Sequence, residues 1–204
     1  MSTILFHEIV YGPIHSRRMG SSLGVNLLPY NGKFCSFDCI YCECGFNKDF
    51  RTQEKLPDRE NVRAAMEDKL QSLHREGVNL DVITFAGNGE PTMHPHFAGI
   101  IDNTITLRNL YFPQTRISVL TDGFHVSKPA VFEALKKVDN PILKLDSAFD
   151  ETVRLINRPV SRQYSVARQV ELYKRFNGAF ILQTMFLRGE FEGRKIDNTT
   201  REEV

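Results

Sequence analysis

The alternation of short apolar runs with helical segments constrains the fold of this 204-residue chain more than any other feature. Five apolar runs, each long enough for a strand, lie at residues 22–28, 82–86, 116–120, 141–145 and 179–187. Segments with helical spacing separate these runs from one another. Strands that alternate with helices form parallel sheets covered by helices, with right-handed crossovers. The sequence therefore predicts an α/β fold built on a parallel sheet.

Four helices are expected between the strands, at residues 58–77, 97–109, after Ser127, and 162–177. Ser127 is expected to be an N-cap, because apolar residues with helical spacing follow it. These are Val131, Ala134, Leu135 and Val138. A further helix is expected to begin at residues 198–200, shortly before Val204.

The composition is that of one globular domain over residues 1–204. The formal net charge is +1, from 26 Lys and Arg against 25 Asp and Glu, which argues against binding to nucleic acid through bulk electrostatics. No apolar run reaches the roughly 18–20 residues that a membrane helix needs. The first residues lack the basic segment of a secretory signal. We therefore expect a cytoplasmic protein without membrane contact.

Chemically distinctive segments follow four of the predicted strands. The cysteines come after 22–28, Gly-Asn-Gly-Glu after 82–86, Thr-Asp-Gly after 116–120, and Asp146 after 141–145. The carboxyl ends of parallel strands meet at one edge of a sheet, where such folds bind ligands. The sequence therefore predicts one functional site at that edge.

The cysteine spacing indicates a metal centre. All four cysteines lie within ten residues, at positions 35, 39, 42 and 44. Disulfides among them would close only very short loops, and structural zinc sites use two Cys-x2-Cys pairs about a dozen or more residues apart. Cys35, Cys39 and Cys42 instead have a Cys-x3-Cys-x2-Cys spacing. Three thiolates fit three irons of a [4Fe–4S] cluster and leave the fourth iron open to a ligand.

With Tyr41 before the third cysteine, this spacing resembles the hallmark of the radical S-adenosylmethionine (radical SAM) enzymes. The resemblance covers about residues 10–190. It implies a partial parallel βα barrel, a [4Fe–4S] cluster on Cys35, Cys39 and Cys42, and S-adenosylmethionine (SAM) as the second cofactor. In that family, one electron cleaves SAM to methionine and a 5′-deoxyadenosyl radical, which abstracts hydrogen from a substrate. An electron donor such as flavodoxin or ferredoxin is implied as a partner.

The resemblance also implies cofactor-binding residues at the strand ends. Tyr41 is expected beside the adenine of SAM. Gly87, Asn88, Gly89 and Glu90 stand where the family has a Gly-Gly-Glu motif that contacts the methionyl amino group. Small residues let backbone carbonyls approach an ammonium group, and Glu90 adds an acceptor. Further matches to the family place four more residues near the ligand: Thr121, Asp122 (where many members have Asn), Asp146 and Gln183.

A narrower resemblance concerns residues 12–26, 87–95 and 156–159. These segments are similar to a subgroup of iron–sulfur oxidoreductases related to the enzymes of wybutosine-type tRNA modification, which keeps RNA as one candidate substrate. Barrels of the wider family have six βα units, whereas this sequence supplies five. We therefore expect a C-terminally truncated chain, with a sheet left open at that edge as the alternative.

Two alternatives remain open. An iron–sulfur electron carrier without SAM chemistry would use Cys44 as the fourth ligand. A zinc-stabilised nucleic-acid-binding module would combine the cysteines with Arg17 and Arg18. These arginines also suit an anionic substrate or surface ion pairs. Arg158 either marks a turn or reaches the ligand.

Overall fold

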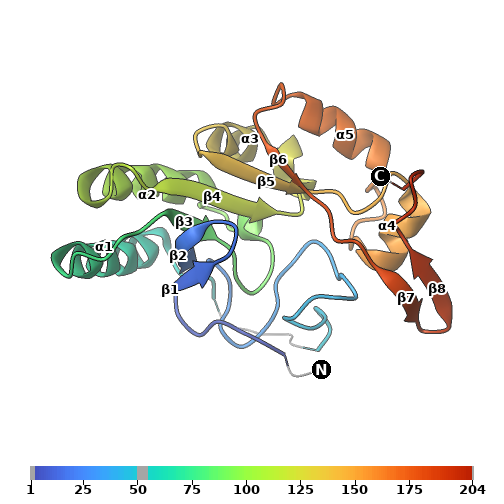
Figure 1. The fold of residues 1–204 in the computed structure, drawn as a ribbon, viewed down its shortest axis with the longest axis horizontal. Helices are drawn as coiled ribbons and strands as arrows, with labels where there is room; N and C mark the ends of the chain where they lie inside the picture. The colour runs from blue at the N-terminus through green and yellow to red at the C-terminus, as the bar shows by residue number, and fades with distance from the viewer. Residues whose placement is uncertain (1–2, 50–54, 204) are drawn as a thin grey trace.

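The computed structural model of the chain describes residues 3–49 and 55–203, and Figure 1 shows their fold. The main sheet has its strands in sequence order: β1 (Val10–Ser16), β2 (Gly20–Val25), β3 (Val82–Phe85), β4 (Arg116–Thr121), β5 (Asn140–Lys144) and β6 (Ile181–Gln183). Strands β2 to β6 are parallel, and β1 is antiparallel to β2. A separate antiparallel hairpin joins β7 (Arg188–Phe191) and β8 (Arg194–Asp197).

Helices connect the parallel strands. They are α1 (Arg59–Arg75), α2 (Phe97–Tyr111), α3 (Pro129–Leu135), α4 (Asp150–Ile156) and α5 (Val166–Lys174), with short 3₁₀ helices η1 (Pro91–Met93) and η2 (Phe124–Ser127). Helix α1 begins after Asp58, whose carboxylate accepts a hydrogen bond from the Asn61 amide at 2.7 Å, as an N-cap does. Among the described residues, no helix is long and apolar enough to span a membrane.

One face of the sheet forms the main core with the helices. Side chains alternate between the two faces of a strand, and on this face the strands carry aliphatic and aromatic residues such as Leu23, Ile83 and Ile117. They pack with apolar residues of α1, α2 and α3, including Met66, Ile100 and Leu135. The residues that alternate with these along each strand therefore point to the opposite face of the sheet.

The opposite face is polar near its centre. The hydroxyl groups of Ser22 and Thr84 lie 2.9 Å apart, and the Asn140 amide donates to Ser118 Oγ at 3.0 Å. No helix of the described residues covers this face in Figure 1, where the β1–β2 hairpin curls toward it instead. The sheet is open at β6, whose Ile181 and Leu182 are about half exposed (48% and 50%). The predicted partial barrel with five parallel strands is thereby confirmed.

Several element predictions are wrong at their boundaries. The first strand begins at Gly20 and ends at Val25, because Asn26 is fully buried and its side chain accepts from the amides of Leu28 and Asn88. Strand β1 was not predicted, since Gly12 and Pro13 interrupt its pattern, and the pairing register shifts there.

The helix predictions near the carboxyl half also need correction. Ser127 ends η2 instead of capping α3, which begins at Pro129 after Lys128. The helix expected over 162–177 is the shorter α5, capped by Ser165, whose Oγ accepts from the Arg168 amide. Helix α4 was not predicted.

The last predicted strand and helix are wrong as well. The strand expected over 179–187 is paired only at Ile181–Gln183, and residues 201–203 form a turn instead of a helix. The Asn198 side chain bridges distant backbone groups instead of capping a helix. Its oxygen accepts from the Leu187 amide at 2.6 Å, and its nitrogen donates to the carbonyls of Asp146 and Met185.

Replacing Phe85 with alanine is expected to lower the free energy of unfolding by about 3–5 kcal/mol. Phe85 is fully buried and packs edge-on against Phe97, so the substitution leaves a cavity between β3 and α2. Urea denaturation measures the change. Leu110→Ala is the control on α2, because Leu110 is 65% exposed, and its effect should stay within about 0.5 kcal/mol. Equal losses in both variants would contradict this packing.

Candidate functional site

The loop that carries the cysteines is joined to the loop after β3 by backbone pairing. The Phe34 amide donates to the Asn88 carbonyl at 2.9 Å, and the Glu90 amide donates to the Phe34 carbonyl at 3.0 Å. Gly89 has φ +137°, and a Cβ there would lie 2.0 Å from the Phe34 carbonyl oxygen. Only glycine permits so close an approach. The pairing therefore sets Cys35 beside the loop that ends in Glu90.

The cysteine loop lies at the carboxyl ends of the strands, next to α4. In Figure 1 it passes below the tips of the β4 and β5 arrows. Cys39 and Cys44 are buried, and Cys35 and Cys42 are half-buried. The surrounding apolar side chains are those of Phe37, Val153, Tyr164 and Val166. The three motif cysteines thus share an apolar shell, which reduces the access of water to a bound group.

The sulfur atoms of the loop have hydrogen-bond partners that suit thiolates. The Phe37 amide donates to Cys35 Sγ and the Asn157 side chain donates to Cys39 Sγ, both at 3.4 Å. Burial raises the pKa of both thiols, and for Cys35 the nearby carboxylate of Asp122 raises it further. These pKa values describe thiols without a metal, because a coordinated thiol is deprotonated outright.

Cys42 is the thiol most easily ionised. A hydrogen bond from Cys44 and the ammonium group of Lys33 outweigh burial and lower the pKa of Cys42 to about 6. The same bond raises the pKa of Cys44, whose thiol also donates to the Gly87 carbonyl at 3.7 Å. Cys44 therefore lies beside Cys42 and the loop after β3.

Lys33 is a buried cation that the sequence analysis did not single out. It is 3% exposed, and its Nζ donates to Asp38 Oδ1 and to the Gly45 carbonyl, each at 3.1 Å. Asp38 Oδ1 also accepts from the Asn47 amide, and the Asn47 side chain bonds both backbone groups of Cys35. These contacts hold the cysteine loop in shape. The one sequence signal for these contacts is the position of Lys33, two residues before the first cysteine.

Glu90 and Asp122 form a buried carboxylate pair beside the cysteine loop. Glu90 Oε1 accepts from Thr121 Oγ1 at 2.7 Å, and Glu90 Oε2 accepts from the Asp122 amide at 2.6 Å. Asp122 Oδ2 accepts from Ser36 Oγ at 2.5 Å and from Cys35 Sγ at 3.8 Å. Three segments thus meet at Glu90 and Asp122: the loop after β3, the loop after β4 and the cysteine loop.

The carboxylate pair is electrostatically unfavourable while it stands alone. Burial and the charge of Asp122 raise the pKa of Glu90 to about 8, and burial raises the pKa of Asp122. Two buried carboxylates side by side do not both ionise readily near neutral pH. The pair is therefore suited to a cationic group, which would let both acids ionise.

Asp146 connects the remaining segments of the rim. Its carboxylate accepts from the Tyr41 hydroxyl, from the Asn157 side chain at 2.5 Å and from the Met185 amide at 2.8 Å. Lys144 Nζ lies 3.4 Å from Oδ1 and 5.1 Å from the centre of the Tyr41 ring. Asn157 was not selected from the sequence, although it lies in the 156–159 segment that supported the narrower resemblance.

The structure thus brings together Cys35, Glu90, Thr121 and Asp122, and it joins Tyr41 to Asp146. It does not bring the Asn88 side chain to them. That amide bonds the backbone of Phe6 and the Pro29 carbonyl, on the far side of its own loop.

Gly87 and Gln183 lie at the margins of this group. A Cβ at Gly87 would lie 2.2 Å from Asn26 Oδ1, so glycine is needed there for packing. Gln183 lies on the open face of the sheet, in register with Lys144.

The arginines singled out from the sequence have different surroundings. Arg158 packs against the rings of Phe46 and Phe191 and forms an ion pair with Glu192 at 3.6 Å, so it joins the cysteine loop to the β7–β8 hairpin. Arg17 and Arg18 lie in the β1–β2 turn, and Arg18 lines a cavity over the open face of the sheet.

Within residues 3–49 and 55–203, no three His, Cys, Asp or Glu side chains converge on a point that could hold a single metal ion. In a four-iron cluster each cysteine binds a different iron atom. The three sulfur atoms therefore do not need to meet at a single point.

Replacing Glu90 with glutamine is expected to change how stability depends on pH. Because the pKa of Glu90 is about 8 in the folded chain against an ordinary 4.5, the folded state holds a proton that the unfolded state releases. The free energy of unfolding therefore falls as pH rises through that window, by at most about 1.4 kcal/mol per pH unit. Glutamine removes this slope.

Urea denaturation of the iron-free chain between about pH 5 and about pH 8 measures that slope. Glu190→Gln on the exposed hairpin is the control and should keep the wild-type slope. Parallel curves for Glu90→Gln and wild type would show that Glu90 is ionised in the folded chain.

Comparison with known proteins places the chain in a family. The sequence profile of the Radical SAM superfamily matches residues 32–195. A UPF0026 protein of Helicobacter pylori is 30% identical over 186 residues, which are 89% of this chain and 57% of that protein. A UPF0026 protein of Methanocaldococcus jannaschii is 30% identical over 184 residues, 88% of this chain and 54% of that protein. The chain thus spans a little over half the length of these relatives.

Among solved structures, archaeal TYW1 matches with a TM-score of 0.49 and 13% identity, over 82% of this chain and 56% of that one. The family match covers most of the chain, including the cysteine loop and both acids. The protein belongs to the radical SAM superfamily, whose cofactors are a [4Fe–4S] cluster and SAM.

Proposed function

We propose that this chain is a radical SAM enzyme that binds its [4Fe–4S] cluster through Cys35, Cys39 and Cys42. The observation that carries the proposal is the direct contact between the cysteine loop and the acid pair, from Ser36 and Cys35 to Asp122. When bound, the cluster supplies the electron that cleaves SAM reductively, and hydrogen abstraction from a substrate follows. This proposal names the cofactors and the class of reaction, and it does not name the substrate.

The residues around the three thiols fit such a cluster. Thiolates are the ligands that iron–sulfur clusters take, and the amide donors to Cys35 and Cys39 stabilise charge on sulfur. The apolar shell formed by Phe37 and Tyr164 keeps water from the sulfur atoms, and the Lys33 ammonium group offsets part of the negative charge of the loop. Lys33 and Asn157 therefore act as positioning residues for the ligand loop.

The acid pair supports binding of the SAM amino group. An ammonium group placed against Glu90 and Asp122 would relieve the repulsion that raises the pKa of Glu90. Thr121 holds Glu90 in place by its hydroxyl group, and the small residues Gly87 and Gly89 let Asn26 and Phe34 pack against the loop that ends in Glu90. We extend the proposal to Tyr41, Asn88, Asp146 and Gln183 as the wider wall of the SAM site, Asn88 through its backbone.

The reaction needs an external one-electron donor, and a flavodoxin or ferredoxin is the proposed class. RNA is the substrate class that the narrower resemblance suggests, and a tRNA-binding assay tests it against a small-molecule substrate. If RNA is the substrate, affinity should fall steeply with added salt, because phosphate contacts release counterions.

Changing Cys35, Cys39 or Cys42 to alanine is expected to abolish both cluster assembly and formation of 5′-deoxyadenosine. Each substitution removes one of three ligands, and two thiolates do not hold a four-iron cluster. Iron and sulfide content after anaerobic reconstitution measures cluster assembly. Chromatography of the reaction mixture measures 5′-deoxyadenosine. Full 5′-deoxyadenosine formation by Cys39→Ala would refute the assignment.

The Cys44→Ser variant distinguishes the proposed enzyme from the alternative, an iron–sulfur electron carrier. Cys44 shares a hydrogen bond with Cys42, and it is the cysteine that an electron carrier would use as its fourth ligand. In the proposed enzyme the variant keeps its cluster and its SAM cleavage. A carrier with four cysteine ligands would lose the cluster in this variant.

Glu90→Gln is expected to keep the cluster but to weaken SAM binding by about tenfold or more, since a charge-assisted hydrogen bond contributes about 1.5–3 kcal/mol. The response of the reduced cluster's electron paramagnetic resonance signal to added SAM measures the affinity. Glu190→Gln should match wild type. An unchanged SAM titration in Glu90→Gln would remove Glu90 from the site.

A further inference from the structure

The open face of the sheet carries a cavity that the proposed cofactor residues largely leave free. It has a volume of about 550 Å³, within the range of small-molecule sites. Apolar side chains make up much of its wall, including Leu120, Ile142, Ile181 and Phe186. A cavity of this kind takes a ligand with an apolar body.

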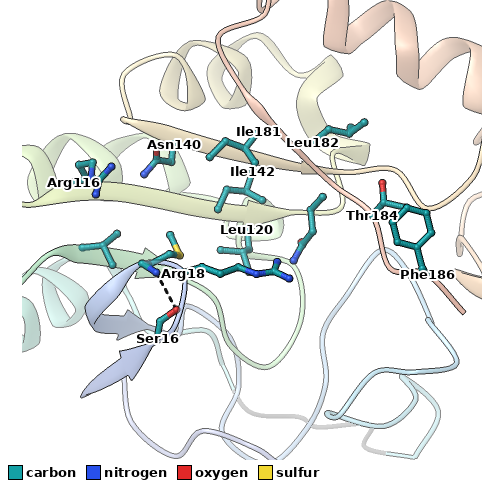
Figure 2. A pocket seen from close by; sticks show the side chains of 13 residues that line it. Ser16, Arg18, Arg116, Leu120, Asn140, Ile142, Ile181, Leu182, Thr184 and Phe186 are labelled. Carbon is teal, nitrogen blue, oxygen red and sulfur yellow. Dashed lines mark hydrogen bonds between the residues drawn. The ribbon is translucent and has the colours of Figure 1, made fainter. Parts of the chain in front are cut away.

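One cation extends through this cavity. Figure 2 shows Arg18 reaching from the β1–β2 turn beneath Leu120, with its guanidinium group toward the carboxyl end of β4, while Arg116 lies at the opposite end. Neither arginine has an acidic partner among the residues that the structure describes. Arg17, the neighbour of Arg18, does not line the cavity.

The cavity leads along one segment to the rim that holds the cysteine loop. Gln183 and Thr184 line the cavity. The amide of the next residue, Met185, donates a hydrogen bond to the Asp146 carboxylate at 2.8 Å. Thr184 Oγ1 is tied to the Leu145 carbonyl at 2.7 Å, so this wall is held against β5. A ligand in the cavity would therefore have one end near the proposed SAM site.

We propose that this cavity binds the substrate, and that the substrate is a small molecule with an anionic headgroup that Arg18 binds. The inference rests on the proposed function, because it treats the cavity as the substrate side of the SAM site. Arg18 is exposed and has no acidic partner in the described part of the chain, and a guanidinium group of this kind beside apolar walls favours a carboxylate or phosphate. A nucleic acid backbone instead needs a row of exposed cations along a groove.

Equilibrium dialysis of the reconstituted chain tests the proposal with benzoate, phenyl phosphate and the neutral benzamide. Benzoate or phenyl phosphate should bind to wild type and benzamide about tenfold or more weakly, and comparing the two anions shows which headgroup is preferred. Arg18→Ala should weaken the preferred anion about tenfold or more, whereas Arg18→Lys should retain part of the affinity. Arg17→Ala is the matched control and should bind like wild type.

Equal weakening in Arg17→Ala and Arg18→Ala, loss confined to Arg116→Ala, or equal binding of benzamide would each overturn the proposal. Salt-dependent tRNA binding that Arg17→Ala and Arg18→Ala reduce alike would overturn it in favour of RNA. Failure of anion binding leaves 5′-deoxyadenosine formation unchanged, whereas failure of the proposed function appears as absent SAM cleavage in a chain that still binds the anion. The two failures are therefore distinguishable.

Discussion

The backbone pairing between Phe34 and the loop after β3 is the contact on which the rest of the site depends. Two hydrogen bonds, to the Asn88 carbonyl and from the Glu90 amide, fix the start of the cysteine loop against a parallel strand end. The pairing needs a glycine at position 89, because any side chain would occupy the space of the Phe34 carbonyl. Side-chain contacts such as Ser36 to Asp122 are added to a loop that is already placed.

The two faces of the sheet differ in the side chains that they carry. The helix-covered face has the apolar residues that stabilise the fold, so the open face is free to carry polar groups such as Thr84 and Ser118. The rim receives the ligand loop, and the open face offers a cavity below it. One face of the strands thus forms the core, and the other lines the cavity.

The parts of the fold that depend on local pattern were predictable from the sequence. The parallel strands, the start of α1 near Asp58 and the meeting of four segments at one rim follow from periodicity and strand direction. Elements set by distant contacts were not predictable. Asn198 has the residue type of a helix cap, but it is satisfied by carbonyl groups up to 52 residues away.

The candidate site shows the same division. Cys35, Cys39 and Cys42 and the acid Glu90 stand out by spacing and position. Lys33 and Asn157 do not, because a single lysine or asparagine becomes informative only when the fold buries it beside a sulfur atom. Asn88 illustrates the converse, since its place in the motif does not reveal that its side chain points toward Phe6.

The contacts that bury the cysteine loop join it to residues far along the chain. Tyr41 and Asp146 are 105 residues apart in sequence, and Cys39 and Asn157 are 118 apart. During synthesis from the amino terminus, the four thiols emerge long before the groups that cover them. Cys39 therefore stays without its contact to Asn157, and open to oxidants and stray metals, until α4 has been made.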